Sequence, residues 1–491
     1  MPAQDNFIVS LDIGSSSVRA LLFDGEGDHR AGFGEQLPYD LRKTSDGGVE
    51  ADAEELSTLA IGCLDRIHGQ LREAGLRPAG VAASAFWHCF LGVGESGEPT
   101  TPILHLFDTR SAAQTETLAK RLDSRAVHQR TGCRFHSSYW PAKLLWLAEK
   151  RVDGFRAARR WMSFPEYLYG KLTGQPACSV SMASASGLWN LRENDYDTEV
   201  LSALPISRAS LWPAGRMDEA QTKLLEPYRS RWPLFDGVPW YPAYGDGACS
   251  NVGTGCVTPD EFCLMVGTSG AMRAVTGAVP AGIPEGLWCY RADRDRAILG
   301  GALTNGGDVY AWMRRNLALP DPDATEAELE TRATGLHGLT VLPYFGGERS
   351  PYWRADLRGA ITGLSLATAP MDILQASLEA VALSFRRVFD LMLPALGSPK
   401  RVVASGGALL HSKAWTQMMA DALGVPVLLA TEKEASARGA ALLALGRGPS
   451  LPEGTAFDPR PGSAAAFAIL KRAGDIALSR VYPPAAPSPH S

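Results

Sequence analysis

The chain has 491 residues, of which 45% are hydrophobic and 21% charged, so it is too long for a single core and two domains are expected. Its formal net charge of -5 argues against a nucleic-acid partner and against a general attraction to anionic membranes. The eight cysteines form no C-x-x-C pair, the first residues lack the basic and apolar regions of a signal peptide, and no apolar run reaches the roughly eighteen residues of a membrane span, so we expect a soluble cytoplasmic protein.

The first predicted element is a hairpin that carries an acidic side chain, Asp12, at the tip of a strand. The runs FIVSLDIG and VRALLFDGEG are rich in strand-forming residues and flank a turn of small residues. Consecutive backbone N–H groups in such a turn form a cradle for phosphate oxygens. An aspartate beside the cradle would repel phosphate unless a cation such as Mg²⁺ lies between them. The alternative is an ordinary hairpin in which Asp12 caps the turn.

A helix and a strand follow before the chain reaches a second conspicuous acid. Residues 47–71 place acids early and apolar residues at helical spacing, and VAASAF at 81–86 is typical of a strand, as in a mixed sheet with crossover helices. Asp246 lies between two glycines, where the backbone is free to turn and the carboxylate to project into a cleft. Asp-Gly is also a common turn dipeptide, so this stretch on its own favours an ordinary turn.

The hairpin pattern recurs at residues 262–275, FCLMVGTSGAMRAV, with hydroxyl side chains in the turn but without the aspartate. Two similar hairpins far apart in the sequence predict two halves of related fold, and together they would grip one polyphosphate in a cleft between two lobes. In such a cleft one acid, Asp12, would hold the metal, and another, Asp246, would accept the proton of an attacking alcohol.

Helices and strands alternate in the carboxyl-terminal part. A long amphipathic helix is predicted at 370–392, a strand that ends in a glycine turn at 401–407, and another helix at 412–423. A glycine turn at the carboxyl end of a strand, opening onto a helix, commonly binds a nucleotide. Residues 481–491 are rich in Pro, Ala and Ser and are predicted to be a disordered tail.

Several ordered motifs carry a family resemblance. GAITGLSLATAPMDILQASLE at 359–379 contains Gly363, Asp372 and Glu379 at the spacing of a known signature, and the segments 404–427 and 434–445 match an adenosine-binding stretch and the helix after it. From about Phe7 to about Gly446 the sequence therefore resembles the FGGY carbohydrate kinases. The resemblance implies an α/β fold of two actin-like, ribonuclease H-like lobes, each a mixed sheet flanked by helices, with a catalytic cleft between a lobe at 1–243 and a lobe at 244–480.

The resemblance also implies a role for each candidate residue, with ATP as the phosphoryl donor and Mg²⁺ as the metal. Asp12 resembles the acid that organises Mg²⁺, and Asp246 resembles the catalytic base, which also contacts the sugar and the metal. Arg19 would assist at the phosphates. The implied phosphate- and nucleotide-binding residues are Gly14, Ser15, Ser16, Ser17, Gly267, Thr268, Ser269, Gly306, Gly406, Gly407 and Ala408.

The sugar pocket is expected from two segments of the amino-terminal lobe, SAFWHCF at 84–90 and LFDTRS at 106–111, which match the family's pocket-lining segments. The candidate substrate-binding residues are Trp87, His88, Asp108 and Arg110. Outside the family context, Trp87 and His88 are equally well explained as core residues, and Asp108 with Arg110 as an ion pair at a helix start.

Local features resemble the gluconate kinases of the family, notably KLLWL at 143–147, VGTSGAMR at 266–273 and the segment 342–364 with its loop GGERSPYW. We therefore expect conversion of gluconate to 6-phosphogluconate. A sugar acid needs a cation for its carboxylate, which Arg110, Lys143 or Arg273 could supply. The loop is alternatively structural, with Arg349 paired to Glu348 or a neighbour.

Three other functions stay open. The first is an FGGY kinase for xylulose, ribulose, glycerol or another polyol, which would share every catalytic motif. The second is a sugar-responsive regulator on the same fold, although no helix-turn-helix precedes Phe7 and no basic patch suits DNA. The third is an ATPase that works by shape change without a small acceptor. The family resemblance also implies a homodimer.

Overall fold

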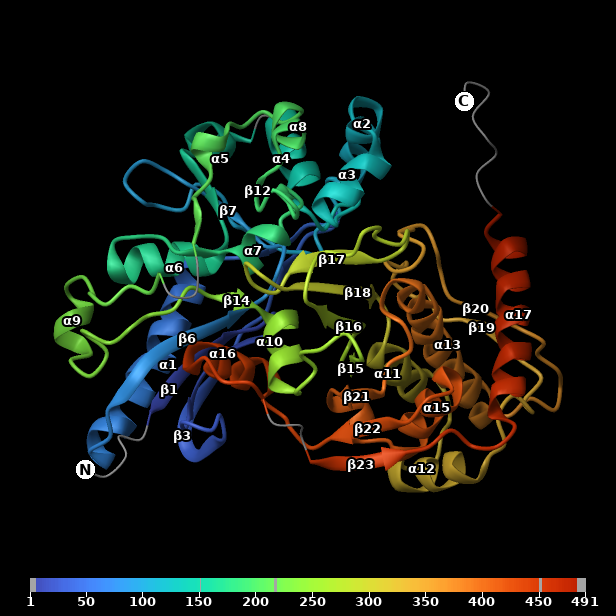
Figure 1. The fold of residues 1–491 in the computed structure, drawn as a ribbon. Helices are drawn as coiled ribbons and strands as arrows, with labels where there is room; N and C mark the ends of the chain where they lie inside the picture. Colours follow the sequence, from blue (N-terminus) through green and yellow to red (C-terminus); the bar gives the residue numbers. More distant parts are fainter. Residues whose placement is uncertain (1–5, 151, 216–218, 450–452, 484–491) are drawn as a thin grey trace.

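The computed structural model describes residues 6–150, 152–215, 219–449 and 453–483, in which two large mixed sheets are flanked by helices (Figure 1). The first sheet has the strand order β14-β6-β1-β2-β3. Strand β1 runs antiparallel to β2 and parallel to β6, and β14 runs parallel to β6, so the first predicted hairpin is confirmed. The strands are β1 (Phe7–Ile13), β2 (Ser17–Phe23), β3 (His29–Pro38), β6 (Pro78–Ala85) and β14 (Tyr244–Gly245).

Helices cover both faces of this sheet because neighbouring residues of a strand point to opposite sides. On one side, Val9 and Leu11 belong to the same core as the buried side chains of α1 (Ala53–Ala74). On the other side, Ile8 packs with residues of α16 (Ala435–Leu445), and the Ser10 hydroxyl donates to the Ala437 carbonyl at 2.7 Å. The helix expected within 47–71 and the strand at 81–86 are therefore present as α1 and β6.

The second sheet has the order β17-β18-β16-β15-β21-β22-β23. Its hairpin β15–β16 confirms the second predicted hairpin, and β15 runs parallel to β21. The long helix α13 (Pro370–Leu396) and helix α15 (Lys413–Leu423) pack beside it, as the sequence predicted. The strands are β15 (Glu261–Val266), β16 (Gly270–Thr276), β17 (Trp288–Arg291), β18 (Ala297–Leu303), β21 (Arg401–Ser405), β22 (Val427–Ala430) and β23 (Gly454–Phe457).

Shorter elements connect and surround the sheets. In the first half they are β4 (Arg42–Lys43), β5 (Val49–Ala51), β7 (Leu91–Val93), β8 (Ile103–Leu104), α2 (Ala112–Arg121), α3 (Ser124–Thr131), α4 (Trp140–Glu149), α5 (Asp153–Ala157), β9 (Arg160–Met162), α6 (Phe164–Thr173), β10 (Cys178–Ser179), α7 (Val180–Ser184), β11 (Trp189–Asn190), β12 (Asp195–Tyr196), α8 (Thr198–Ser202), a 3₁₀ turn (Arg208–Ser210), β13 (Ala214–Gly215) and α9 (Tyr228–Arg231). In the second half they are α10 (Asp246–Gly253), α11 (Gly307–Asn316), α12 (Pro322–Thr331), β19 (Thr340–Leu342), β20 (Ala360–Thr362), α14 (Gly407–Leu410) and α17 (Ser463–Val481).

Helices α10 and α16 cross where the two sheets meet (Figure 1). The crossing is close because each helix offers a glycine. A Cβ atom on Gly439 of α16 would overlap the carbonyl of Cys249, and one on Gly253 of α10 would overlap the carbonyl of Ala435. Strand β14, directly before α10, belongs to the first sheet. The division of the chain at 243/244 stays a prediction.

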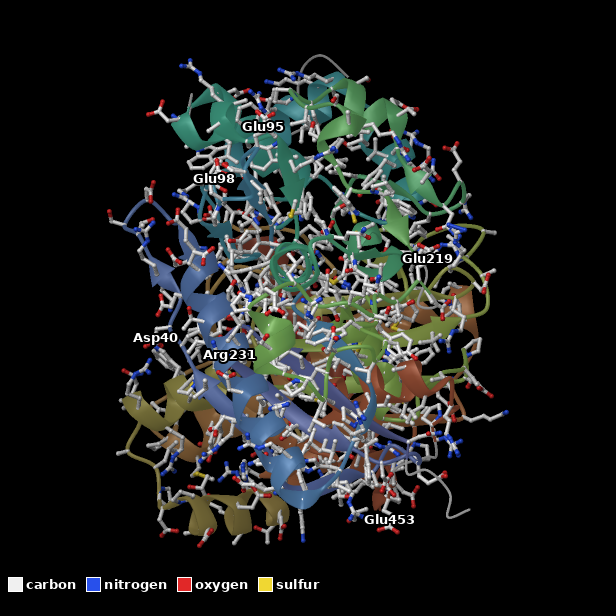
Figure 2. The ribbon with its side chains drawn as sticks, turned by 90° about the vertical axis from the view of Figure 1, so that its left-hand side faces the viewer. Asp40, Glu95, Glu98, Glu219, Arg231 and Glu453 are labelled. Carbon is white, nitrogen blue, oxygen red and sulfur yellow. The ribbon has the colours of Figure 1, made fainter. Side chains whose placement is uncertain are left out.

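The periphery carries charges of both signs. Figure 2 shows exposed side chains such as Asp40, Glu95 and Glu453 around the rim of the molecule, and Arg231 there pairs with Asp65. None of the helices in the described ranges is both long and apolar enough to cross a bilayer. Helix α17 runs to Val481, and residues 484–491 of the predicted tail lie outside the described residues.

Candidate active site

Asp12 and Asp246 lie at one edge of the first sheet. Asp12 is the next-to-last residue of β1 and pairs in register with Ser84 of β6, and Ser84 in turn pairs with Tyr244 of β14. Because β1, β6 and β14 are parallel, their carboxyl ends meet at this edge, and Asp246 follows β14 as the first residue of α10. The carboxyl edge of parallel strands is the usual place for a ligand in α/β sheets.

Asp12 is buried and Asp246 is half-buried, and each has an arginine as electrostatic partner. Burial raises the pKa of Asp12 to about 6, while the Arg19 guanidinium, 3.7 Å away, acts in the opposite direction; the Asp246 carboxylate adds to the rise. Burial also raises the pKa of Asp246, and the positive charge of Arg273 partly offsets this rise. Arg19 is itself shared with Glu434 at 2.6 Å, so the edge carries more negative than positive charge.

This donor set fits Mg²⁺. The ion is commonly bound by one or two carboxylates and completes its coordination with water and substrate phosphates, rather than by an all-protein cage. Among the described residues no group of three or more His, Cys, Asp or Glu could enclose a metal, whereas Asp12 and Asp246 offer two carboxylates with a deficit of positive charge. The excess negative charge at this edge is what a divalent cation would balance.

The first hairpin turn leaves two of its three serines exposed. Ser15 and Ser16 are exposed at the tip, and Gly14 N–H closes the turn on the Ser17 carbonyl at 3.0 Å. Ser17 is buried, and its hydroxyl accepts a hydrogen bond from Gln36 at 3.1 Å, so its side chain points into the hairpin. A ligand at this turn would therefore meet Ser15 and Ser16 before Ser17.

Three glycine turns from the carboxyl half converge on one another. The turn at Gly267 of the second hairpin accepts the N–H of Gly307, which begins α11, at 2.8 Å, and Thr268 O accepts Asp308 N–H. Gly306 has no room for a side chain, because a Cβ would lie 2.8 Å from the Ser269 backbone. Gly406, before α14, has φ +95° and lies against the Val266 carbonyl. These contacts explain why glycine is required at positions 306 and 406.

The converging turns line a cleft of about 950 Å³. Four predicted nucleotide-binding residues, Gly267, Thr268, Gly407 and Ala408, lie on its surface. Its aromatic lining was not predicted from the sequence: the Trp312 and Phe345 rings lie 5.0 Å apart. The available signal was the position of Trp312 on the helix that follows the glycine pair 306–307. The remaining lining residues are Gly307, Asp308, Tyr310, Ala311, Arg314, Arg315, Pro322, Asp323, Glu326, His411, Ser412 and Trp415.

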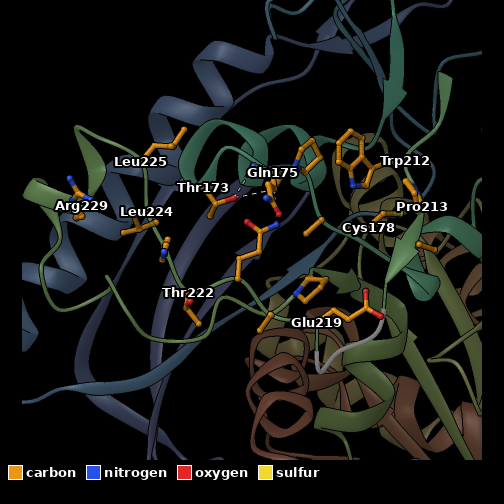
Figure 3. Close-up of a pocket in the computed structure, with 17 residues that line it drawn as sticks. Thr173, Gln175, Cys178, Trp212, Pro213, Glu219, Thr222, Leu224, Leu225 and Arg229 are labelled. Carbon is orange, nitrogen blue, oxygen red and sulfur yellow. Dashed lines mark hydrogen bonds between the residues drawn. The ribbon is translucent and has the colours of Figure 1, made fainter. Parts of the chain in front are cut away.

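A second hollow, of about 790 Å³, lies in the amino-terminal half around Gln175, Trp212 and Thr222 (Figure 3). Its described lining contains none of the predicted site residues. Of these two hollows, the cleft at α11 and α14 is the one that contains predicted nucleotide-binding residues.

Trp87 packs directly against the two glycines that flank Asp246. Cβ atoms on Gly245 or Gly247 would overlap the Trp87 indole, whose Nε1 donates to the Ser181 carbonyl at 3.1 Å. The flat ring and the missing side chains thus fix the backbone on both sides of Asp246. Trp87 was predicted to bind substrate, and the structure places it next to the predicted base.

His88 has the left-handed backbone angle φ +69°, which is uncommon outside glycine and often marks a functional site. Its Nδ1 lies 2.7 Å from the Ala185 carbonyl, so Nδ1 carries the proton and Nε2 has a free lone pair. Burial lowers the pKa of His88 to about 3, which keeps the ring neutral. The rings of Tyr139 and Tyr290 lie 5.1 and 5.4 Å away.

Asp108 and Arg110 form the ion pair that the alternative interpretation described. Arg110 Nη2 lies 2.5 Å from Asp108 and 2.6 Å from Glu50, and the guanidinium lies over the Trp146 ring at 4.6 Å. With two carboxylates on one guanidinium, Arg110 is poorly suited to hold a third. A direct substrate contact by either residue stays a prediction.

Lys143, one of the three candidate cations, and Arg349, for which the alternative interpretation gave Glu348 or a neighbour as partner, both donate to backbone carbonyls. Lys143 is fully buried and its Nζ donates to the carbonyls of His105 and Ser138 at 2.7 and 3.1 Å, while burial lowers its pKa to about 8. Arg349 forms no ion pair with Glu348: the Glu348 carboxylate accepts the backbone N–H groups of Thr304 and of Arg349 itself. The Arg349 guanidinium instead donates to the Leu303 carbonyl at 2.8 Å.

Comparisons with known proteins agree with this arrangement. Residues 7–253 match the model of the FGGY family of carbohydrate kinases, N-terminal domain, and residues 263–446 match the C-terminal domain. A gluconokinase of Bacillus subtilis (strain 168) is 27% identical over 90% of this chain and 87% of its own length, and a glycerol kinase of Mycobacterium tuberculosis is 28% identical over 89% and 87%. The crystal structure of gluconate kinase from Lactobacillus acidophilus superposes with a TM-score of 0.89 at 25% identity, covering 97% of this chain and 98% of that one.

Proposed function

Because the chain belongs to the FGGY family of carbohydrate kinases, which are phosphotransferases with an alcohol group as acceptor, we propose that it transfers the γ-phosphoryl group of ATP to a hydroxyl of gluconate. The observation that carries the proposal is the pair of carboxylates at one edge of the first sheet, the buried Asp12 and the half-buried Asp246, with Trp87 packed against the glycines that flank Asp246.

In this proposal Asp246 is the general base. Its raised pKa makes it a better proton acceptor than an exposed aspartate, while Arg273 favours the ionised form that a base needs. The Trp87 ring fixes the backbone around it, which holds the carboxylate in place before the substrate arrives. Asp246 would orient the acceptor hydroxyl and take its proton as the oxygen attacks phosphorus.

Asp12 and Asp246 would hold Mg²⁺, which neutralises charge on phosphate oxygens when bound. Backbone N–H groups of the first hairpin turn (Ser15, Ser16, Ser17) and of the second (Thr268, Ser269) would bind phosphate. Gly14 and Gly267, whose own N–H groups close the two turns, would let the phosphate approach. Gly306, Gly406, Gly407 and Ala408 would line the nucleotide. The cleft at α11 and α14 supports the proposal that ATP binds there, because it combines glycine turns with the Trp312 and Phe345 rings.

For the sugar, Trp87, His88, Asp108 and Arg110 are the proposed contacts. The neutral His88 ring suits a hydroxyl, since its free Nε2 accepts a hydrogen bond. Gluconate is favoured over other acceptors because the relatives named above include a gluconokinase and a gluconate kinase. A neutral polyol is the second candidate, because a xylulose kinase and glycerol kinases are also similar to this chain.

The test is an ADP-release assay with ATP and Mg²⁺ on gluconate, xylulose, ribulose, glycerol and erythritol, with Asp246→Asn beside the unsubstituted protein. We expect gluconate to be the preferred acceptor and Asp246→Asn to lower kcat by about 10²- to 10⁴-fold. ATP affinity, measured by calorimetry, should change little.

If the protein prefers a neutral polyol, Asp246 remains the proposed base, but gluconate is no longer the proposed substrate. An equal loss of catalysis and of ATP binding in Asp246→Asn would count against the base. If none of these acceptors stimulates ADP release, the protein is instead a sugar-responsive regulator or an ATPase that works by shape change.

A further inference from the structure

A loop from the carboxyl half, residues 346–354, reaches the predicted sugar pocket of the amino half. Its Trp353 ring lies 5.2 Å from the His136 ring and 6.2 Å from the Tyr139 ring. Trp353 has φ +54°, its N–H donates to the Arg349 carbonyl and its Nε1 donates to the Gly286 carbonyl at 3.0 Å. The loop is therefore anchored on both sides, and its arginine is held at the pocket.

Arg349 forms no ion pair with a carboxylate among the described residues, although the charge of the neighbouring Glu348 acts on its pKa. One of its nitrogens, Nη2, donates to a carbonyl, and its Nε is buried with no hydrogen-bond partner. Arg110, in contrast, is paired with two carboxylates, and Lys143 is enclosed by backbone carbonyls. A buried donor left without a partner is costly, and a ligand that supplies an acceptor removes the cost.

A continuous set of side chains connects the predicted base to this arginine. Trp87 lies against the glycines that flank Asp246, and the Tyr290 ring lies 5.1 Å from Trp87. Tyr290 contacts His88, and the positive charge of Arg349 acts on the titration of Tyr290 and His88. The predicted sugar site is thus bounded by the predicted base at one end and by a guanidinium without an ion pair at the other.

The histidines between these ends supply hydrogen bonds rather than charge. Burial lowers the pKa of both His88 and His136 to about 3. Ser138 N–H donates to Nδ1 of His136 at 3.2 Å, so His136 carries its proton on Nε2 and can donate, whereas His88 Nε2 can accept. One donor and one acceptor without protein partners among the described hydrogen bonds suit a chain of hydroxyl groups.

We propose that Arg349 binds the carboxylate of an aldonic acid whose distal hydroxyl is phosphorylated beside Asp246. The inference rests on the proposed kinase function and names the residue that selects an acid over a neutral polyol. A guanidinium suits this role because its planar fork can donate two parallel hydrogen bonds to one carboxylate. Arg273 faces Asp246 at the reacting end and would not serve the carboxylate.

The experiment compares Arg349→Gln and Arg349→Lys with the unsubstituted protein on gluconate and on glucitol, the neutral polyol of the same length. For Arg349→Gln we expect KM for gluconate to rise roughly 10- to 100-fold, because the substrate loses one charged hydrogen-bonding partner. KM for glucitol should not change. Arg349→Lys should recover part of the gluconate affinity. Arg354→Gln is the matched control, because Arg354 belongs to the same loop and is paired with Asp356.

The outcomes separate the two proposals. An unchanged KM for gluconate in Arg349→Gln overturns the role of Arg349 and leaves the proposed function intact. A loss of equal size on gluconate and glucitol, with ATP affinity kept, also overturns it, since a carboxylate contact cannot affect a neutral substrate. Turnover of neutral polyols but not of gluconate by the unsubstituted protein overturns the substrate and the role of Arg349 together.

Discussion

At the residue scale, the pocket depends on side chains whose state is set by burial rather than by residue type. His88 is neutral because its environment disfavours the imidazolium, and its tautomer follows from the single carbonyl that it faces. Burial raises the pKa values of Asp12 and Asp246 above those of an exposed aspartate. The proposed chemistry requires these pKa shifts. Asp246 must accept a proton, and His88 must be neutral to accept a hydrogen bond from a sugar hydroxyl.

We predict that His88→Asn raises KM for the sugar by about 10-fold, because asparagine tolerates the left-handed backbone angle but removes the Nε2 acceptor. Since the pKa of His88 lies at about 3, the ring is neutral from pH 5 to pH 8, and kcat/KM should have the same pH profile in both proteins. Steady-state kinetics across that range checks both points. A pH limb present only in the unsubstituted protein would show that His88 titrates.

At the element scale, the first turn of α6 contains a buried acid, Glu166, which forms a capping box with Ser163. Glu166 is 3% exposed, and its Oε2 accepts the N–H of Ser163 at 2.7 Å and the Ser163 hydroxyl at 2.7 Å. Burial raises the pKa of Glu166 to about 7 despite these hydrogen bonds. The helix is therefore best stabilised when Glu166 is protonated.

We predict that Glu166→Gln removes a pH dependence of stability. A folded pKa of about 7 against an ordinary value of 4.5 means that the folded state binds the proton more tightly, so the stabilisation is complete below pH 4.5 and is lost as the pH rises through 7. At pH 8 the variant should be more stable by about 3 kcal/mol, because glutamine keeps an accepting oxygen without the charge. Denaturant unfolding at pH 5 and pH 8 measures this, and Glu73→Gln in the exposed end of α1 is the control. An equal gain at both pH values would contradict the titration.

Local pattern predicted the elements but not the contacts between them. The hairpins β1–β2 and β15–β16, and the helices α1, α13 and α15, were recognisable because alternation and helical spacing are properties of neighbouring residues. The sequence predicted the ion pair between Arg110 and Asp108, which is two residues away, but not the one with Glu50, which is sixty residues away. One interpretation of the sequence paired Arg349 with Glu348 or a neighbour, and nothing local indicated that Trp353 of the same loop lies against His136 and Tyr139. Such contacts depend on how distant segments pack, and a single sequence carries no local signal for them.

At the scale of the whole molecule, the site is assembled from both sheets. Asp12, Trp87 and His88 come from the first sheet and its loops, Gly267 and Gly406 come from the second, and Asp246 begins α10, which crosses α16 between them. The crossing positions the base, because α10 carries Asp246 at its first residue and cannot shift relative to α16 without moving it.

We predict that Gly439→Ala lowers both stability and turnover. The added methyl group would overlap the Cys249 carbonyl, so the two helices must separate, which costs about 1–3 kcal/mol of unfolding free energy. Separation displaces Asp246, and a misplaced base should lower kcat by on the order of 10- to 100-fold. The control is Gly69→Ala in α1, where a Cβ meets no atom within 4 Å and alanine is expected to stabilise the helix by about 1 kcal/mol. Unfolding curves and kcat measured on both variants decide the matter: a destabilised Gly439→Ala protein with normal kcat would mean that the position of Asp246 is set by β14 and Trp87 alone, and that the crossing serves stability only.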